Sequence, residues 1–431
     1  AYGYPGYDPL DLGKVTLDSA GNFSMSFPLE QATEARFVHG DEAAWMYLMP
    51  DSEMQITLDA EQFDESLSYS GEHSSASNYL ADRFMLTEQM EQSLQSQWFL
   101  LEPEAFVAYS DSSLAVKQQH LEKFFEDKTA PESFKEMASA SLVAAWISNR
   151  SVYPMYHRHY AQKEEMPEMP EGYDSHWDKL PMDSPALLTS NAYRASLENQ
   201  LENLRDEQII GEINSMEDYL EGYKKVFFAL KEDKSMAPEI ADFLRATALL
   251  TIVDATGTTG NDSLMADYRK SAVSEKSLAK VEKTWEGWLK LAPGQPAPDF
   301  TFPNRQGEMV SLSDFKGKVV YIDVWATWCG PCLGELPSSK KLKTQYEGNE
   351  DVVFMYVSID ENKEAWENML AEDPEFKGVH IISPDGWESD INKKYMIKGI
   401  PRYMLIDREG NIADVDAPRP SSGEELTTQI D

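Results

Sequence analysis

The first part of the chain alternates apolar and polar side chains in short runs. The clearest runs are residues 44–48, 54–58 and 67–71. A period of two is typical of strands that have one face in water. The turn-forming segment 18–22 lies between Val15–Leu17 and Phe23–Phe27, which predicts a further hairpin there. We therefore expect residues 1–74 to form an antiparallel, sandwich-like β domain.

From residue 75 onward the apolar positions recur at intervals of three and four, which is typical of helices that bury one face. A clear example is the series Tyr219, Tyr223, Val226, Phe227 and Leu230. The segment Met166–Pro185 is rich in Pro, Gly and Asp, so it predicts a long loop between two groups of helices. Residues 75–290 are therefore predicted to form an all-α domain.

A third pattern begins after the proline-containing linker 291–298. Two almost continuously apolar runs, 319–324 and 352–357, are typical of central parallel strands. Residues 333–346 between them have a helical pattern, and residues 403–413 predict a closing antiparallel hairpin. The chain is thus expected to be a multidomain α+β protein whose last domain, residues 293–431, is of the α/β class.

The charge of the chain excludes several kinds of partner. Asp and Glu number 75 against 38 Lys and Arg, which gives a formal net charge of −37. Such a surface repels phosphate backbones and anionic lipid, so we expect no nucleic-acid partner. The chain also lacks an apolar run long enough for a membrane helix. Membrane contact is expected only through an anchor preceding Ala1.

The chain contains only two cysteines, Cys329 and Cys332, within the sequence Trp-Cys-Gly-Pro-Cys. The motif lies where the first buried strand leads into a helix, and free amide groups at a helix N-terminus stabilise a thiolate. Cys329 is therefore predicted to attack a substrate disulfide, and Cys332, one turn into the helix, to resolve the mixed disulfide. Gly330 would allow a substrate backbone to approach, and Pro331 suits a first helical turn.

A lone pair of cysteines can also belong to a zinc site or form a structural disulfide. Half of a zinc site would need further ligands, but the chain has no second Cys pair and His380 is the only histidine after residue 176. We therefore expect no metal. A purely structural disulfide is disfavoured because closing so short a loop stabilises a fold only weakly.

The C-terminal region resembles the TlpA/ResA-type thioredoxin-fold oxidoreductases of the bacterial envelope. The matching segments are Ala297–Phe300, Gly307–Leu312, Phe315–Val320, Trp325–Cys332, Glu335–Pro337 and Gly399–Pro401. The resemblance covers roughly a third of the chain. Residues 1–290 resemble, more loosely, the sheet-and-helix modules that precede thioredoxin domains in other envelope proteins.

The resemblance implies a substrate-binding rim around the two cysteines. Pro401 aligns with the cis-proline of the family, which leaves the backbone of Ile400 free to pair with a substrate strand. Trp328, Gly330 and Pro331 complete the substrate-binding residues that we expect.

Two carboxylates are expected to handle protons at the dithiol. Glu335 follows Cys332 by three residues and so returns to the same helix face. The family uses a glutamate there for proton transfer. Asp323 lies in a buried strand at a position where thioredoxins keep an acid, so its pKa should be raised and it can take the proton of Cys332. Many TlpA-like domains lack this acid, so the division of labour between the two stays open.

These features predict a thiol–disulfide oxidoreductase with no cofactor beyond the Cys329–Cys332 disulfide. The Gly-Pro dipeptide resembles that of reducing thioredoxins, so we expect a reductase of the periplasm or cell envelope, with a lipid anchor as one arrangement. Its substrates would be disulfide-bearing envelope proteins, for example haem-attachment cysteines in cytochrome c biogenesis, and a membrane electron-relay thiol reductase would keep it reduced. The alternatives are a disulfide oxidase or isomerase, and a partner-binding module over residues 1–290 with an auxiliary redox domain.

Overall fold

A computed structural model describes residues 12–93, 97–209 and 215–431, and two compact units can be distinguished in it. The N-terminal unit comprises residues up to 249 together with 267–280, and the C-terminal unit comprises 250–266 and 281–431. The borders predicted after residues 74 and 290 remain predictions, and residues 1–11 of the first predicted domain lie outside the described residues.

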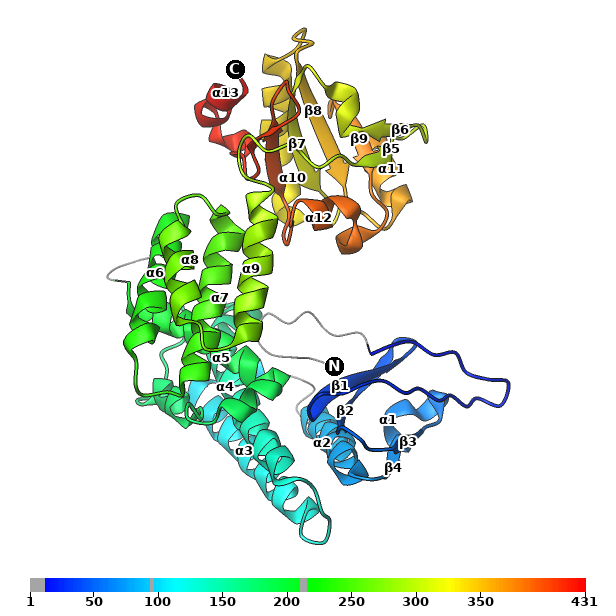
Figure 1. Ribbon diagram of the computed structural model, residues 1–431, viewed down its shortest axis with the longest axis vertical. Coiled ribbons are helices and arrows are strands. Elements are labelled where there is room, and N and C mark those ends of the chain that lie inside the picture. Colours follow the sequence, from blue (N-terminus) through cyan, green and yellow to red (C-terminus); the bar gives the residue numbers. More distant parts are fainter. Residues whose placement is uncertain (1–11, 94–96, 210–214) are drawn as a thin grey trace. The chain divides into compact units, whose positions relative to one another are not determined.

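The β-rich part of the N-terminal unit consists of two antiparallel ribbons (Figure 1). They are formed by β1 (Thr33–His39) with β2 (Glu42–Leu48), and by β3 (Met54–Thr57) with β4 (Ser68–Gly71). The short helix α1 (Phe63–Ser66) lies between β3 and β4 in sequence. Ala35, Met46 and Tyr69 form the small core of this part.

The predicted hairpin of Val15–Leu17 and Phe23–Phe27 is wrong, since neither segment forms a strand in the structure, which describes both. The turn between them does form, because the carboxylate of Asp18 accepts hydrogen bonds from the backbone of Ala20 and Asn22, both at 2.8 Å. The apolar side chains on either side stay widely exposed, for example Leu17 at 44%. A ribbon that buries so little apolar surface is not stable in water.

The rest of the N-terminal unit is helical, as predicted. The helices are α2 (Ser74–Ser93), α3 (Pro103–Phe124), α4 (Glu132–Tyr160), α5 (Asn191–Glu207) and α6 (Met216–Glu232). Parts of α7 (Pro238–Thr256), α8 (Asp262–Ser271) and α9 (Glu275–Leu289) belong to each unit. The predicted long loop separates α4 from α5 and carries two 3-10 segments, Tyr173–Lys179 and Pro185–Thr189.

The C-terminal unit is built on a five-stranded mixed sheet with the order β11-β10-β7-β8-β9. These strands are β7 (Val319–Trp325), β8 (Val352–Ser358), β9 (Val379–Ile382), β10 (Arg402–Ile406) and β11 (Ile412–Asp414). β7, β8 and β9 are parallel, whereas β10 runs antiparallel to β7 and pairs with β11. This confirms the predicted parallel pair and the closing hairpin.

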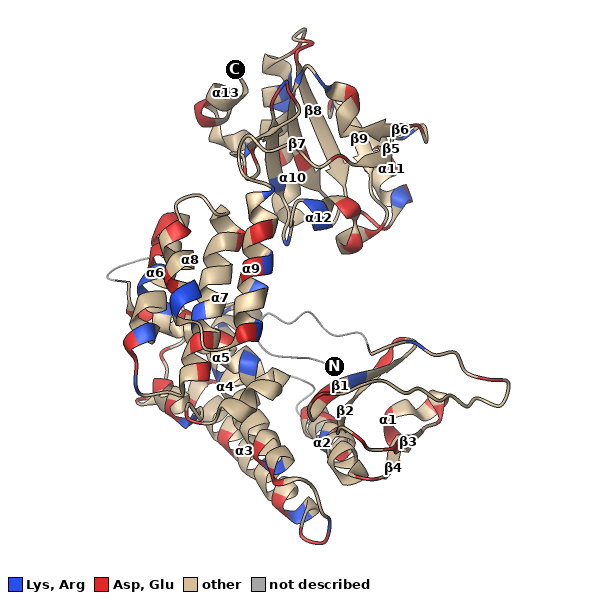
Figure 2. Ribbon diagram, in the orientation of Figure 1, with Lys and Arg blue, Asp and Glu red and all other residues tan. Residues whose placement is uncertain are grey.

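Helices and one further ribbon surround this sheet (Figure 1). The helices are α10 (Gly330–Gln345), α11 (Lys363–Glu372), α12 (Asp390–Lys394) and α13 (Glu424–Ile430), and the ribbon consists of β5 (Thr301–Pro303) and β6 (Met309–Ser311). Every residue of β8 is buried, which explains its uninterrupted apolar sequence. Acidic side chains are distributed over both units rather than collected at one place (Figure 2).

Candidate active site at the start of helix α10

The two cysteines form a disulfide at the point where β7 leads into α10. Cys329 is the residue that precedes the helix, and its Sγ accepts a hydrogen bond from the backbone N–H of Cys332 at 3.2 Å. An amide that donates to a sulfur stabilises the thiolate form of that sulfur. The helix therefore favours negative charge on Cys329 rather than on Cys332.

The residues next to the disulfide are more exposed than the disulfide itself. Cys329 and Cys332 are 5% and 3% exposed, so burial hardly distinguishes them. Trp328, by contrast, is 58% exposed, and Gly330 and Pro331 are exposed as well. A Cβ atom added at Gly330 would meet no atom within 4 Å, so internal packing gives no reason for a glycine there. Its small size matters only toward something that approaches from outside.

A second tryptophan extends this exposed rim. The ring of Trp387 lies 6.2 Å from that of Trp328, and Trp387 is itself 45% exposed. Trp387 belongs to the short 3-10 segment Gly386–Glu388, which follows β9. The sequence prediction missed this residue, because a single tryptophan in a loop carries no positional signal.

The predicted substrate-binding residues Ile400 and Pro401 lie at the same edge of the sheet. β10 begins at Arg402, which pairs with Val324 near the end of β7. Because the two strands are antiparallel, the start of β10 lies beside the end of β7, where the cysteines follow. The Ile400–Pro401 peptide bond is cis, as predicted.

Asp323 lies in the centre of the sheet, opposite Tyr356 of β8 and Tyr403 of β10. It is 4% exposed, and its Oδ1 is buried without a hydrogen-bond partner in the described part of the chain. Burial, and secondarily the nearby charge of Glu335, raises the pKa of Asp323 to about 8. The predicted rise of its pKa is confirmed, and the carboxyl is mostly protonated at neutral pH.

Glu335, on α10, is held by a single residue near the C-terminus. One of its carboxylate oxygens accepts a hydrogen bond from the backbone N–H of Ser421 at 3.0 Å, and the other accepts from the Ser421 hydroxyl at 2.8 Å. Glu335 is close enough to Asp323 for its charge to affect the pKa of Asp323. The charge of one acid therefore affects the protonation of the other.

A third acid, Asp360, fixes the loop that carries the cysteines. It is 1% exposed, and its carboxylate accepts hydrogen bonds from the backbone N–H of Thr327 at 3.0 Å, from the Thr327 hydroxyl at 2.6 Å and from the Ser358 hydroxyl at 2.7 Å. Sequence reasoning missed it. A signal existed, because Asp360 follows the second parallel strand, and the carboxyl ends of parallel strands meet at the same edge of a sheet.

Within the described ranges, no group of three or more His, Cys, Asp or Glu side chains is arranged to hold a metal ion. None of the helices that the structure describes is long and apolar enough to cross a bilayer.

Comparisons with known proteins concern the C-terminal region. The Redoxin family model matches residues 292–429. The thioredoxin-like protein YneN of Bacillus subtilis is 34% identical over 125 residues, which are 29% of this chain and 71% of that protein. The thiol-disulfide oxidoreductase ResA of Bacillus thuringiensis is 32% identical over 123 residues, 28% of this chain and 68% of that protein. A crystal structure from Bacteroides vulgatus, described as that of a thiol-disulfide oxidoreductase, has 42% identity and a TM-score of 0.30, covering 33% of this chain and 96% of that one.

Proposed function

The chain belongs to the ResA-like thiol–disulfide oxidoreductases, and from this premise we propose that it reduces disulfides of cell-envelope proteins through Cys329 and Cys332. That it exchanges electrons between thiols and disulfides follows from the family and from the Cys329–Cys332 disulfide. The observation that carries the proposed order of steps is the hydrogen bond from the Cys332 N–H to the Cys329 sulfur.

In the reduced protein the Cys329 thiolate attacks one sulfur of the substrate disulfide. A bond forms between Cys329 and that sulfur, and the other substrate sulfur leaves as a thiolate that takes up a proton. Cys332, after losing its proton, then attacks Cys329, which releases the second substrate thiol and forms the protein disulfide. Two electrons have passed to the substrate. A membrane thiol reductase returns two electrons to Cys329 and Cys332.

Asp323 is proposed to hold the proton that Cys332 loses. In the oxidised protein the carboxyl of Asp323 is buried and its pKa is raised to about 8, so it retains a proton near neutral pH. In the reduced protein its ionised form serves as the base for Cys332. Glu335 is proposed to raise the basicity of Asp323 through its charge while both of its own oxygens are occupied by Ser421.

The exposed residues beside the dithiol are proposed to receive a substrate segment. Trp328 offers an aromatic surface, and Gly330 and Pro331 present little obstacle to an approaching backbone. Ile400, next to Pro401 at the same sheet edge, is proposed to pair with the substrate strand through its backbone. Such contacts recognise an extended peptide rather than a particular sequence.

Reduction, rather than oxidation, is the proposed direction because the Gly330-Pro331 pair resembles that of thioredoxins, whose potentials lie near roughly −270 mV. A reductase of this kind needs a compartment in which disulfides form, which for the proposed clients is the envelope. Among these clients we include apocytochromes with oxidised haem-attachment cysteines.

The full chain with Cys332→Ser tests this proposal. Without the resolving thiol, mixed disulfides between Cys329 and client proteins should accumulate, and mass spectrometry of the adducts identifies the clients. Cys329→Ser is the matched control and should trap none. If Cys332→Ser traps no protein, the proposal is wrong.

The direction is tested separately by equilibrating the unaltered protein with glutathione. A potential near roughly −270 mV supports reduction, whereas a value near roughly −120 mV, typical of a strong oxidant, would reverse the direction.

A further inference from the structure

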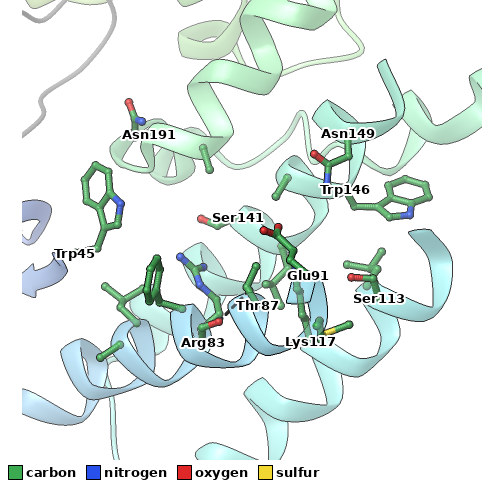
Figure 3. A pocket seen from close by; sticks show the side chains of 18 of the residues that line it. Trp45, Arg83, Thr87, Glu91, Ser113, Lys117, Ser141, Trp146, Asn149 and Asn191 are labelled. Atoms are coloured by element: carbon green, nitrogen blue, oxygen red, sulfur yellow. Dashed lines mark hydrogen bonds between the residues drawn. The ribbon is translucent and has the colours of Figure 1, made fainter. Parts of the chain in front are cut away.

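A cavity of about 590 Å³ lies within the N-terminal unit, apart from the thiol chemistry. Its walls come from β1 and β2 and from helices α2, α3, α4 and the start of α5. Figure 3 shows Arg83, Thr87 and Glu91 along α2, with Ser141 and Asn149 of α4 across the cavity. The volume falls within the range of roughly 300–1,000 Å³ that is usual for small-molecule sites.

Three cationic side chains line this cavity, namely Arg36, Arg83 and Lys117. Arg83 and Lys117 form no ion pair with any carboxylate of the described residues, although the chain carries 75 acidic residues. They also lie close enough together to repel each other, and burial together with the charge of Arg83 lowers the pKa of Lys117. Two partly buried like charges without a direct ion pair repel each other, and an anion placed between them would relieve this repulsion.

Further hydrogen-bonding groups are available on the same walls. The hydroxyl of Ser113 and the amide of Asn149 have no hydrogen-bond partner among the described residues. Both side chains are able to donate to an oxygen atom of a ligand. A few polar groups without protein partners on an otherwise apolar wall are typical of a ligand site.

The acids of the cavity limit the charge of the ligand. Glu91 lies on the same wall and its charge opposes the fall in the pKa of Lys117, so it is near that ammonium without pairing with it. Glu34, which is buried, accepts a hydrogen bond from the backbone N–H of Asn191 at 3.1 Å and feels the charge of Arg83. Together with Asp64, which also lines the cavity, these carboxylates would repel a second negative charge on the ligand.

The remainder of the wall is apolar and aromatic. Leu80 and Leu114 are buried in it, and Phe84 is 47% exposed. Trp45 and Trp98 contribute rings from β2 and from the segment before α3. A ligand that fills the apolar part of the cavity must carry an apolar chain or ring. A small hydrated anion would leave the aromatic side chains in contact with water, which is unfavourable.

We propose that this cavity binds a small amphipathic monocarboxylate, with its carboxylate between Arg83 and Lys117 and its apolar body against Trp45, Phe84 and Trp98. The lining residues belong to the N-terminal unit, and the proposal does not depend on the proposed function. Fatty acids of medium chain length belong to this chemical class.

Isothermal titration of the full chain with octanoate tests the proposal, with octanamide and succinate as comparison ligands. Octanoate should bind with a one-to-one stoichiometry. Octanamide, which has the same chain without the charge, should bind at least about tenfold more weakly. Succinate should also bind more weakly, because its second carboxylate meets the acids of the cavity. No binding of octanoate at millimolar concentration would overturn the proposal, as would equal or tighter binding of either comparison ligand.

Variants then locate the binding site. Lys117→Gln and Arg83→Gln should each weaken octanoate binding about tenfold or more. Lys123→Gln, on the same helix but outside the cavity, is the matched control and should bind like the unaltered chain. Asn149→Asp, at an exposed position, adds a negative charge without removing a packing contact, and should weaken octanoate more than octanamide. Undiminished octanoate binding in Lys117→Gln, Arg83→Gln and Asn149→Asp would place the ligand elsewhere and refute the proposal.

Discussion

Replacing Asp323 by asparagine removes an ionisable group from the centre of the sheet while nearly keeping the shape of the side chain. The pKa of this carboxyl is raised from 3.8 to about 8, first by burial and then by the charge of Glu335. The pKa differs by about 4 between the folded and unfolded states. Since one pKa unit corresponds to about 1.36 kcal/mol, this difference amounts to about 6 kcal/mol of unfolding free energy. The folded state holds the proton of Asp323 more tightly than the unfolded state. The contribution of Asp323 to stability is therefore most favourable below pH 3.8 and is lost as the pH rises to about 8.

Asp323→Asn should therefore stabilise the oxidised protein, and the gain should depend on pH. It should be near zero at pH 4, increase by about 1.4 kcal/mol per pH unit, reach about 4 kcal/mol at pH 7 and level off above pH 8. The difference between variant and unaltered chain isolates Asp323 from every other titrating group. Water that enters beside the ionised carboxylate would reduce these gains, so they are upper limits.

The measurement is denaturant or calorimetric unfolding of the full chain between pH 4 and 9. Two units imply more than one transition, and the transition that shifts when the Cys329–Cys332 disulfide is reduced reports on the C-terminal unit. Glu409→Gln, at an exposed position before β11, is the matched control and should not change the pH profile. A gain that is the same at pH 4 and pH 8, or a loss of stability at pH 8, would refute the reasoning about burial.

Four further substitutions test other parts of the C-terminal unit. Asp360→Asn should lower the stability of the redox-sensitive transition by about 2–3 kcal/mol, because an amide cannot accept all the hydrogen bonds from Thr327 and Ser358; unfolding curves that coincide with those of the unaltered chain would contradict this. Burial lowers the pKa of His380 from 6.5 to about 4, so the stability that it contributes is present above pH 6.5 and is lost as the pH falls toward 4, by up to about 3 kcal/mol. His380→Gln, measured by unfolding at pH 5 and pH 7, should remove this loss, and an unchanged pH profile would show that the ring is not responsible. Gly378→Ala would bring a Cβ to 2.5 Å from the Tyr356 ring and 2.9 Å from the Phe354 carbonyl oxygen, and should cost about 1–3 kcal/mol in thermal unfolding. Gly334→Ala on α10, where the added methyl group meets nothing within 4 Å, should instead raise stability by roughly 0.5–1 kcal/mol.

The sequence predicted those elements best whose pattern results from burial on two sides. β7 and β8 are almost wholly apolar because both faces of the sheet are buried there, and their parallel pairing follows from the helix between them. The hairpin predicted at Val15–Leu17 failed because alternation alone does not supply a surface on which to pack. β1 was not predicted, although Ala35 is buried in its ribbon.

The same contrast applies to the site. Cys329, Cys332 and Pro401 are recognisable from the sequence because of their residue types. Cysteine carries a reactive thiol, and proline restricts the backbone, wherever in a chain they occur. Asp360 is one of many acids in the chain, and its place after the second parallel strand becomes meaningful once its burial and its hydrogen bonds to Thr327 are known. The role of a carboxylate can be assigned only when its surroundings are known, because an ion pair or hydrogen bond of a carboxylate on the surface contributes little to stability.

The three acids of the thiol site differ in what their surroundings allow. Asp360 accepts hydrogen bonds from Thr327 and Ser358, so it holds the loop in place. Glu335 has both oxygens engaged by Ser421. Asp323 alone keeps a buried oxygen without a partner in the described part of the chain, and its pKa of about 8 lies near the pH at which thiols ionise. Proton exchange is most efficient between groups of similar pKa, so we infer that Asp323 exchanges the proton with Cys332 and that Glu335 adjusts the pKa at which this happens.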